Sequence, residues 1–347
     1  MKYSLRCVSC GARFSKTKSQ ICPKCGGLLE VEYERNAIVD HIKSFWDLEP
    51  VLPNGHYKHF VVGNTTLVES EKRDLLLKLE TLNPTHSFKD RGSVIEVAKA
   101  KEYGYKEIVC ASTGNMAYSI SYFAKLYGIR SVIFISKGAN KDKLIDIKMT
   151  HDSELHLING DFTKAQKDAE QYAENNSAFL AGDYCYRKEG QSTIGFELFY
   201  QHGEINNIIM PIGNGTLFSA VYKAYSRIKN ADAIEKLPRL IGVQASLCAP
   251  LAHAAHGGIK YEKPRTKADA IAVGYPTYGT QVLDAIKHTS GALITVTDSE
   301  MVHWQKKFYA SYGILAELAG VASMAAYARI ASRLKGKTAV LITGANL

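Results

Sequence analysis

The stretch Asn83-Pro84-Thr85-His86-Ser87-Phe88-Lys89-Asp90-Arg91-Gly92 decides how the rest of the chain is interpreted. An Asn-Pro pair favours a turn, and the helical pattern that follows it places Lys89 at a helix entry. The partial positive charge at a helix N-terminus disfavours an ammonium group, so a desolvated lysine there shifts toward the neutral amine that adds to an aldehyde. A solvent-exposed lysine at the start of a helix is the plainer alternative.

On the C-terminal side of this stretch, apolar runs alternate with amphipathic helical segments. The expected helices cover 91–104, 116–128, 163–176, 191–201, 217–228, 299–312 and 317–335. The expected strands cover 107–112, 130–136, 153–158, 177–182, 206–213, 239–245, 292–298 and 338–344, and residues 141–149 continue the rhythm. Continuously apolar strands that alternate with helices predict parallel sheets covered on both faces. We therefore expect an α/β protein with two open, mostly parallel-sheet lobes.

The chain is expected to divide into three parts. Residues 1–30 form a small polar unit that contains two cysteine pairs. Residues 31–90 plus 190–347 form the larger α/β lobe, and residues 91–189 form a smaller, mobile α/β lobe.

Composition excludes several classes of protein. Of 347 residues, Lys and Arg number 43 against 34 Asp and Glu, a net charge of +9, but the basic residues are scattered. Without a dense basic run, nucleic-acid binding is not expected. No apolar run approaches the ~20 residues of a membrane helix, and MKYSLRC lacks the apolar core of a secretory signal. We expect no membrane partner and a cytoplasmic location.

Four cysteines have the spacing of a metal site: Cys7-x-x-Cys10 and Cys22-x-x-Cys25. Four thiolates arranged as two such pairs can close a tetrahedral structural zinc site. The alternative is four free thiols, or a site that has lost its metal. A closed four-thiolate site leaves no open position, so we expect Zn²⁺ here to stabilise the N-terminal unit and not to catalyse.

Two turns lie between an expected strand and an expected helix. In the first, Ser112, Thr113, Gly114 and Asn115 offer amides and hydroxyls that suit a carboxylate. In the second, backbone N–H groups can converge on a phosphate, and the residues concerned are Gly213, Asn214, Gly215, Thr216 and Leu217. Each turn taken alone is as well explained as an ordinary strand-to-helix connection. Thr343, at the end of a buried strand, means little by itself.

Taken together and in order, these segments resemble the fold-type II pyridoxal-phosphate (PLP) enzymes, and among those most closely the threonine synthases. The matching segments are NPTHSFKDRG (83–92), ASTGN (111–115), RKEGQST (187–193), MPIGNGT (210–216), GVQASLCAPL (242–251), AIAVGYP (270–276), GILAELA (313–319) and LITG (341–344). The resemblance spans nearly the whole chain. The cysteine pairs suit the N-terminal zinc ribbon of many threonine synthases.

The resemblance implies a PLP enzyme that acts on a small amino acid and forms a homodimer. It implies that Lys89 bonds to the cofactor's aldehyde and moves protons, that Asn115 binds the cofactor's O3′, and that the 213–217 amides bind its phosphate. The larger lobe is then the PLP-binding lobe. Thr343 would meet the pyridine nitrogen, and a hydroxyl there makes the ring a milder electron sink, suited to elimination and replacement.

Threonine synthases convert O-phospho-L-homoserine and water to L-threonine and phosphate, so the substrate's own phosphate needs donors. The resemblance implies that the substrate is bound by Ser112, Thr113, Gly114, Met116, Arg187 and His86. Met116, Leu217 and His86 depart from the family pattern, and Arg187 is the obvious remaining anion partner. Either the pocket is retuned away from phosphohomoserine, or other residues, His86 among them, replace the missing donors.

Three other functions are considered. The first is β-elimination or β-replacement on a different amino acid, as in a deaminase or a cysteate-synthase-like enzyme. The second is a catalytically silent protein of this fold, against which the retention of Lys89, Asn115 and Thr343 argues. The third, a zinc-ribbon nucleic-acid binder, leaves the core motifs unexplained.

Overall fold

A computed structural model describes residues 1–15, 17, 19–70, 74–112, 114–136, 153–160, 162–254 and 258–346. The chain forms two compact units. Unit 1 contains Met1–Arg35, Trp46–Val62 and Lys89–Gly190, and unit 2 contains Asn36–Phe45, Gly63–Phe88 and Gln191–Leu347. The three-part division expected from the sequence stays a prediction, and the segment 141–149 lies outside the described residues.

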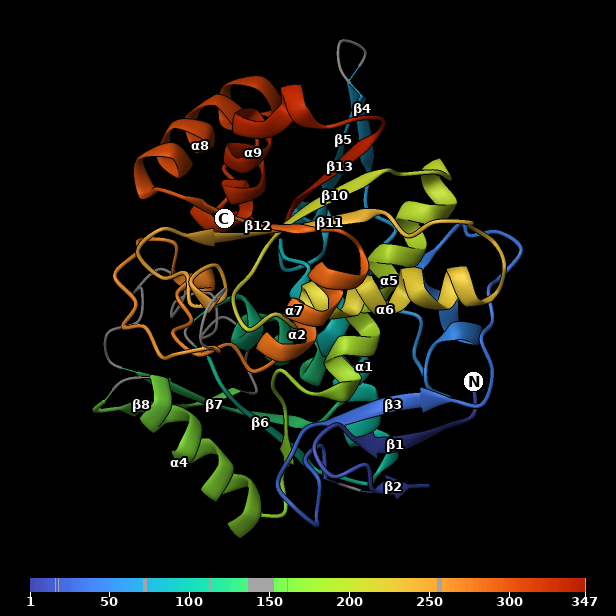
Figure 1. The fold of residues 1–347 in the computed structure, drawn as a ribbon. Helices are drawn as coiled ribbons and strands as arrows, with labels where there is room; N and C mark the ends of the chain where they lie inside the picture. Colours follow the sequence, from blue (N-terminus) through green and yellow to red (C-terminus); the bar gives the residue numbers. More distant parts are fainter. Residues whose placement is uncertain are drawn as a thin grey trace. The chain divides into compact units, whose positions relative to one another are not determined.

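Unit 1 holds two sheets. The smaller is antiparallel with the order β2-β1-β3, and comprises β1 (Tyr3–Cys7), β2 (Arg13–Phe14) and β3 (Leu29–Tyr33). The larger is parallel with the order β8-β7-β6-β9, and comprises β6 (Glu107–Ala111), β7 (Arg130–Ser136), β8 (Ser153–Ile158) and β9 (Phe179–Leu180). Helix α4 (Phe162–Asn175) covers one face of the larger sheet, and α1 (Lys89–Glu102) and α2 (Asn115–Tyr127) lie on the other (Figure 1).

Unit 2 is built on a six-stranded sheet with the order β12-β11-β10-β13-β5-β4. Its strands are β4 (Leu67–Ser70), β5 (Leu75–Leu79), β10 (Asn207–Pro211), β11 (Arg239–Ala245), β12 (Ala292–Val296) and β13 (Thr338–Ile342). All neighbouring pairs are parallel except β4 with β5. A short edge strand of the opposite direction is common on such sheets.

Helices cover both faces of this sheet. Helices α8 (Asp298–Tyr312) and α9 (Leu318–Ile330) lie on one face, and α6 (Thr216–Asn230) and α7 (Gly279–His288) lie on the other (Figure 1). Helix α5 (Cys185–His202) begins in unit 1 and continues into unit 2. The short 3₁₀ segments are η1 (Phe45–Val51), η2 (Glu80–Leu82), η4 (Asp269–Ile271) and η5 (Ala331–Arg333). One apolar core joins the strands to α9 through Val243, Val321 and Val340 among others.

The predicted α/β class with two mostly parallel sheets is confirmed. Helix α5 begins at Cys185, ahead of the expected start at residue 191, and the helix expected over 317–335 ends at Ile330. Helix α7 was not predicted, because it follows a region rich in Gly and Pro that gave no periodic signal. None of the helices in the described ranges is both long and apolar enough to cross a bilayer. The cytoplasmic location stays a prediction.

A buried charged side chain extends from strand β5 of the unit 2 sheet. Lys78 on β5 is fully buried, and its Nζ donates to Glu197 Oε2 at 2.7 Å, to Gln201 Oε1 at 2.8 Å and to the carbonyl of Thr65 at 2.8 Å. Glu197 is also fully buried and accepts from the Asn64 N–H at 2.6 Å. Because both charges are shielded from water, the stability of the folded protein depends on each charge keeping its partner.

Replacing Lys78 with methionine should therefore destabilise the protein by about 3–5 kcal/mol, because Glu197 is left as an uncompensated buried charge. The double variant Lys78→Met/Glu197→Leu, which removes both charges, should recover most of that loss. Denaturant unfolding followed by circular dichroism measures the difference. Equal destabilisation in the single and double variants would contradict this account.

Candidate functional site

The position of Lys89 is set by the loop that precedes it. The Phe88 N–H donates to the carbonyl of Thr343 at 3.0 Å, and the Ala345 N–H donates to the carbonyl of His86 at 3.0 Å. An antiparallel bridge pairs Ser87 with Gly344 between them. Residues 86–88 are thus tied to the chain just after β13, and Lys89, the next residue, begins α1. The expected placement of Lys89 at a helix entry is confirmed.

The other end of the same loop is fixed by Asn83. Its Nδ2 donates to the carbonyl and to Oε2 of Glu80 at 2.9 and 3.0 Å, and its Oδ1 accepts from the Gly63 N–H at 2.9 Å. Its carbonyl accepts from the His86 N–H at 2.8 Å. Glu80 is fully buried and also accepts from the Thr65 hydroxyl at 2.8 Å. Both ends of the lysine-bearing loop are therefore anchored by buried polar groups.

His86 has a left-handed backbone with φ of 57°, which is uncommon for a residue with a side chain. Its Nδ1 lies 3.2 Å from the carbonyl of Thr81. Since a carbonyl only accepts, Nδ1 carries the hydrogen, and Nε2 of the neutral ring keeps a lone pair. Whether His86 binds substrate stays a prediction.

The turn after β10 has the construction of an anion site. Gly215 caps α6 at φ of 84°, and the first turn of that helix has neither a side-chain cap nor an acidic residue. A Cβ on Gly215 would lie 2.7 Å from Val282 Cγ2, and one on Gly213 would lie 2.8 Å from the carbonyl of Ala270. By contrast, α8 is capped by its own Thr297 and Glu300. The backbone of the 213–217 turn therefore fits a phosphate. The side chain of Leu217 is apolar and buried, so it contributes no hydrogen-bond donor.

The turn after β6 lies in unit 1. Gly114 caps α2 without a side-chain hydrogen bond, the first turn of α2 has no acidic residue, and the Gly114 N–H donates to Ser112 Oγ at 3.3 Å. Asn115 is the first residue of α2 and Met116 follows it, both partly buried. Thr113 lies outside the described residues. An uncapped helix start of this kind suits a carboxylate, and the binding of a carboxylate here stays a prediction.

Arg187 lies in a buried ion pair. Its Nη2 donates to Glu96 Oε2 and, at 3.3 Å, to Ser93 Oγ, its Nε donates to the carbonyl of Gly182 at 3.0 Å, and its Nη1 approaches the carbonyl of Lys89 at 3.5 Å. Both Arg187 and Glu96 are fully buried. Burial raises the pKa of Glu96 to about 7, against the opposing charge of Arg187. The prediction that Arg187 binds an anionic group of the substrate stays untested, but its charge is already paired with Glu96.

Glu96 was not singled out in the sequence. The available signal was a lone acidic residue in the otherwise apolar run Val94-Ile95-Glu96-Val97-Ala98, on a helix that is buried along most of its length. A charge in such a run is rarely buried without a partner. The partner lies 91 positions away in the chain, so only the fold identifies it.

The predicted site residues fall into two groups. In unit 2, strands β10 and β13 are parallel neighbours, so the 213–217 turn and Thr343 emerge at the same carboxyl edge of the sheet, where His86 is bonded to Ala345. In unit 1, Lys89 starts α1, Arg187 reaches its carbonyl, and residues 112–116 follow β6. Parallel α/β sheets bind their ligands at this carboxyl edge.

The four N-terminal cysteines form one cluster. Their Sγ atoms all lie within 4.8 Å of one another, with Cys7 and Cys25 at 3.5 Å and Cys10 and Cys22 at 3.8 Å. The backbone N–H of Cys10, directed at the Cys7 Sγ, lowers the pKa of that thiol to about 6. Four sulfur atoms that converge in this way fit a tetrahedral metal ion.

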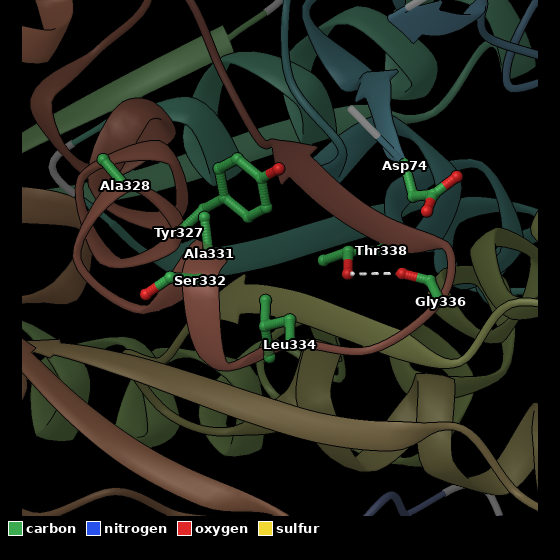
Figure 2. A pocket seen from close by; sticks show the side chains of 8 residues that line it. All are labelled: Asp74, Tyr327, Ala328, Ala331, Ser332, Leu334, Gly336 and Thr338. Atoms are coloured by element: carbon green, nitrogen blue, oxygen red, sulfur yellow. Dashed lines mark hydrogen bonds between the residues drawn. The ribbon is translucent and has the colours of Figure 1, made fainter. Parts of the chain in front are cut away.

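A pocket of about 390 Å³ lies elsewhere in unit 2 (Figure 2). Tyr327, Ala331, Leu334 and Thr338 are among the residues that line it, and the carboxylate of Asp74 lies at its side. Thr338 is the first residue of β13 and Asp74 directly precedes β5. This pocket is therefore at the amino edge of the sheet, opposite to the edge that carries Thr343, and it is not the predicted site.

Replacing Gly215 with alanine tests the predicted phosphate turn. A left-handed residue with a Cβ costs roughly 1–2 kcal/mol, and the added carbon must displace Val282. We expect PLP affinity, measured by titration of its absorbance, to fall ~10-fold or more for Gly215→Ala. The same change at Gly203, which also has a positive φ but where a Cβ meets no atom within 4 Å, should leave that affinity unchanged. Equal affinities in both variants would argue against this turn.

Comparison with known proteins agrees with this arrangement. The family described as pyridoxal-phosphate dependent enzyme matches residues 59–344. Threonine synthase of Methanosarcina acetivorans is 32% identical over 93% of this chain and 85% of its own length, and that of Methanocaldococcus jannaschii is 30% identical over 92% and 85%. Among solved structures, maize serine racemase has a TM-score of 0.73 at 24% identity, covering 82% of this chain and 89% of its own. The processed form of threonine deaminase isoform 2 from Solanum lycopersicum has a TM-score of 0.71 at 21% identity, covering 82% and 79%. The chain therefore belongs to the family of pyridoxal-phosphate-dependent enzymes.

Proposed function

We propose that this PLP-dependent lyase removes the α-proton of an amino acid with Lys89 and expels an oxygen-linked leaving group, as a threonine synthase-like enzyme. The observation that carries the proposal is the attachment of residues 86–88 to residues 343–345, which ends on Lys89. This attachment fixes residues 86–88, which directly precede Lys89, at the carboxyl edge of the unit 2 sheet. The 213–217 turn follows a strand at the same edge. The family match and the threonine synthase relatives support the same chemistry.

Bound PLP supplies an electron sink for the α-carbon. In the proposed mechanism, the amides of residues 213–217 would hold its phosphate, Asn115 would bind its O3′ and Thr343 would bind its pyridine nitrogen. The turn 112–114 holds the substrate carboxylate at the start of α2. Lys89 Nζ takes the proton from the α-carbon and holds it for the departing group or the product. Because Thr343 contributes a hydroxyl and not a carboxylate, we expect elimination in preference to transamination.

Two classes of substrate are compatible with that chemistry. The relatives named threonine synthase favour O-phospho-L-homoserine, with L-threonine and phosphate as products. The second class is another amino acid that undergoes β-elimination or β-replacement. The pairing of Arg187 with Glu96 favours the second class, because the expected partner of the substrate phosphate already faces a carboxylate. A homodimer, implied by the family resemblance, remains a prediction.

The variant Lys89→Ala should lose both the visible absorbance of the lysine-bound cofactor and the consumption of amino-acid substrates, with activity falling at least ~10³-fold. Absorbance spectra and a product assay over a panel of amino acids measure the two effects. Lys101→Ala, on the exposed end of the same helix, is the matched control and should retain both. Undiminished turnover in Lys89→Ala would refute the proposal.

We also propose that Cys7, Cys10, Cys22 and Cys25 bind a structural Zn²⁺. Hydrogen bonds join residues 1–33 to the segment 180–189: Gln20 donates to the carbonyl of Leu180 at 2.5 Å, Tyr33 donates to Glu189 Oε2 at 2.5 Å, Lys188 donates to Glu30 Oε1 at 2.6 Å, and the hydroxyls of Tyr3 and Tyr186 lie 3.0 Å apart. The N-terminal unit therefore supports the start of α5. Its closed sulfur set supports a structural and not a catalytic role.

Elemental analysis should find a single zinc ion per chain, and Cys22→Ser should lose it. Because the ion holds the segment that contacts α5, its loss should increase amide hydrogen exchange in residues 180–189, while α4 serves as the internal reference. Hydrogen exchange followed by mass spectrometry measures this. Full protection of 180–189 in the zinc-free protein would show that the N-terminal unit does not depend on the metal.

A further inference from the structure

We propose that Glu96 is a specificity-determining residue. By neutralising Arg187, it directs the enzyme to amino acids whose leaving group is an uncharged hydroxyl, in preference to phosphate esters. This inference rests on the proposed lyase function and names its substrate class.

The Arg187–Glu96 pair lies at the carboxyl edge of the unit 1 sheet. The Ala181 N–H donates to the carbonyl of Val109 at 2.8 Å, so residues 181–182 run beside the end of β6, which leads into the 112–115 turn. The carbonyl of Gly182 accepts from Arg187 Nε at 3.0 Å, and the Gly182 N–H donates to Glu96 Oε1 at 3.1 Å. Both partners of the pair are therefore bound to the same residue at that edge.

The pair also adjoins the catalytic lysine. Glu96 lies two helical turns after Lys89 on α1, and residues so spaced share a face of the helix. Arg187 Nη2 donates to Ser93 Oγ on the intervening turn at 3.3 Å, and Nη1 approaches the carbonyl of Lys89 at 3.5 Å. A net charge on this pair would therefore interact electrostatically with a substrate that reacts at Lys89.

Above pH 7, where Glu96 is mostly ionised, the net charge of this pair is close to zero. Arg187 directs Nη2 to a carboxylate and Nε to a carbonyl, and its side chain is 0% exposed, as is that of Glu96. A phosphate monoester brings up to two negative charges, which are costly to bury without a cation. Next to Arg187 alone such a group would be stabilised, but the adjacent carboxylate cancels that attraction.

A hydroxyl leaving group has no such requirement. When the Cα–H bond breaks, Lys89 Nζ takes the proton, and the electron pair forms the Cα–Cβ double bond as the Cβ–O bond breaks. The hydroxyl leaves with the proton returned by Nζ, so that water is the product and no anion accumulates. A β-hydroxy amino acid such as L-serine or L-threonine can therefore react beside a neutral pair.

Matched pairs of substrates test this inference: L-serine against O-phospho-L-serine, and L-homoserine against O-phospho-L-homoserine. Assays at pH 8, above the raised pKa of Glu96, keep the ion pair charged. We expect the wild-type kcat/KM to be higher for L-serine than for O-phospho-L-serine. In Glu96→Gln, which can still accept from the Gly182 N–H, the ratio of phosphorylated to hydroxyl substrate should rise at least ~10-fold.

Calorimetric titration with O-phospho-L-homoserine and with L-homoserine, made with all variants in a Lys89→Ala background that cannot consume the ligand, gives a readout that does not depend on turnover. Affinity for the phosphorylated ligand should increase in Glu96→Gln and return to the wild-type value in Glu96→Gln/Arg187→Gln, because the gain needs the unmasked guanidinium. Glu189→Gln is the control: it is the same change at a buried glutamate of unit 1 that contacts Tyr33. It should shift neither ratio nor affinity.

The outcomes separate the two levels of the proposal. A preference of the wild type for the phosphorylated substrates, or an unchanged ratio and affinity in a folded Glu96→Gln, overturns the role of Glu96 and leaves the lyase proposal standing. Failure of the protein to bind PLP at Lys89 or to consume any amino acid overturns the lyase proposal itself. In that second case, the titrations still show whether Glu96 masks Arg187.

Discussion

The hydrogen bonds that tie residues 86–88 to residues 343–345 are the constraint on which the site depends. Parallel pairing of β5, β13 and β10 brings the carboxyl ends of three strands to one edge, and these hydrogen bonds then direct the chain that leaves β5 along that edge. Lys89 is the first residue after this path, and Thr343 and the 213–217 turn lie on the same edge. The proposed reaction of Lys89 with a bound aldehyde needs its position to be fixed before the cofactor binds.

Buried charges occupy both units, and they serve different purposes. In unit 2, Lys78 on β5 pairs with Glu197 on α5, and hydrogen bonds to Gln201 and to backbone groups add to this pair. Glu80 extends the same polar interior to Asn83 and so to the lysine-bearing loop. Buried ion pairs contribute little to net stability compared with apolar packing. Here they fix the positions of side chains, because a buried charge must stay within hydrogen-bonding distance of its partner.

The Arg187–Glu96 pair differs because it lies beside Lys89, the residue that is proposed to react. The sequence predicted Arg187 as an anion partner of the substrate, but the attraction of its charge for an anion depends on the groups around it. Burial raises the pKa of Glu96, and Arg187 opposes that rise, so the pair is a balance between desolvation and attraction. Met116 and the buried Leu217 also offer no polar donor from their side chains, which agrees with the proposed preference for substrates without a phosphate.

The sequence by itself determined the α/β class, most of the helices and strands, the cysteine set and the position of Lys89 at a helix start. These follow from local properties: apolar periodicity, turn residues and cysteine spacing act over a few positions, so they can be read along the chain. The tertiary structure alone decided that Arg187 faces Glu96 and that Lys78 faces Glu197. It also decided that His86 adopts a left-handed backbone and that residues 86–88 form hydrogen bonds with residues 343–345. Each of these depends on groups far apart in the chain, and the energy of a buried charge depends on its partner and not on its neighbours in sequence.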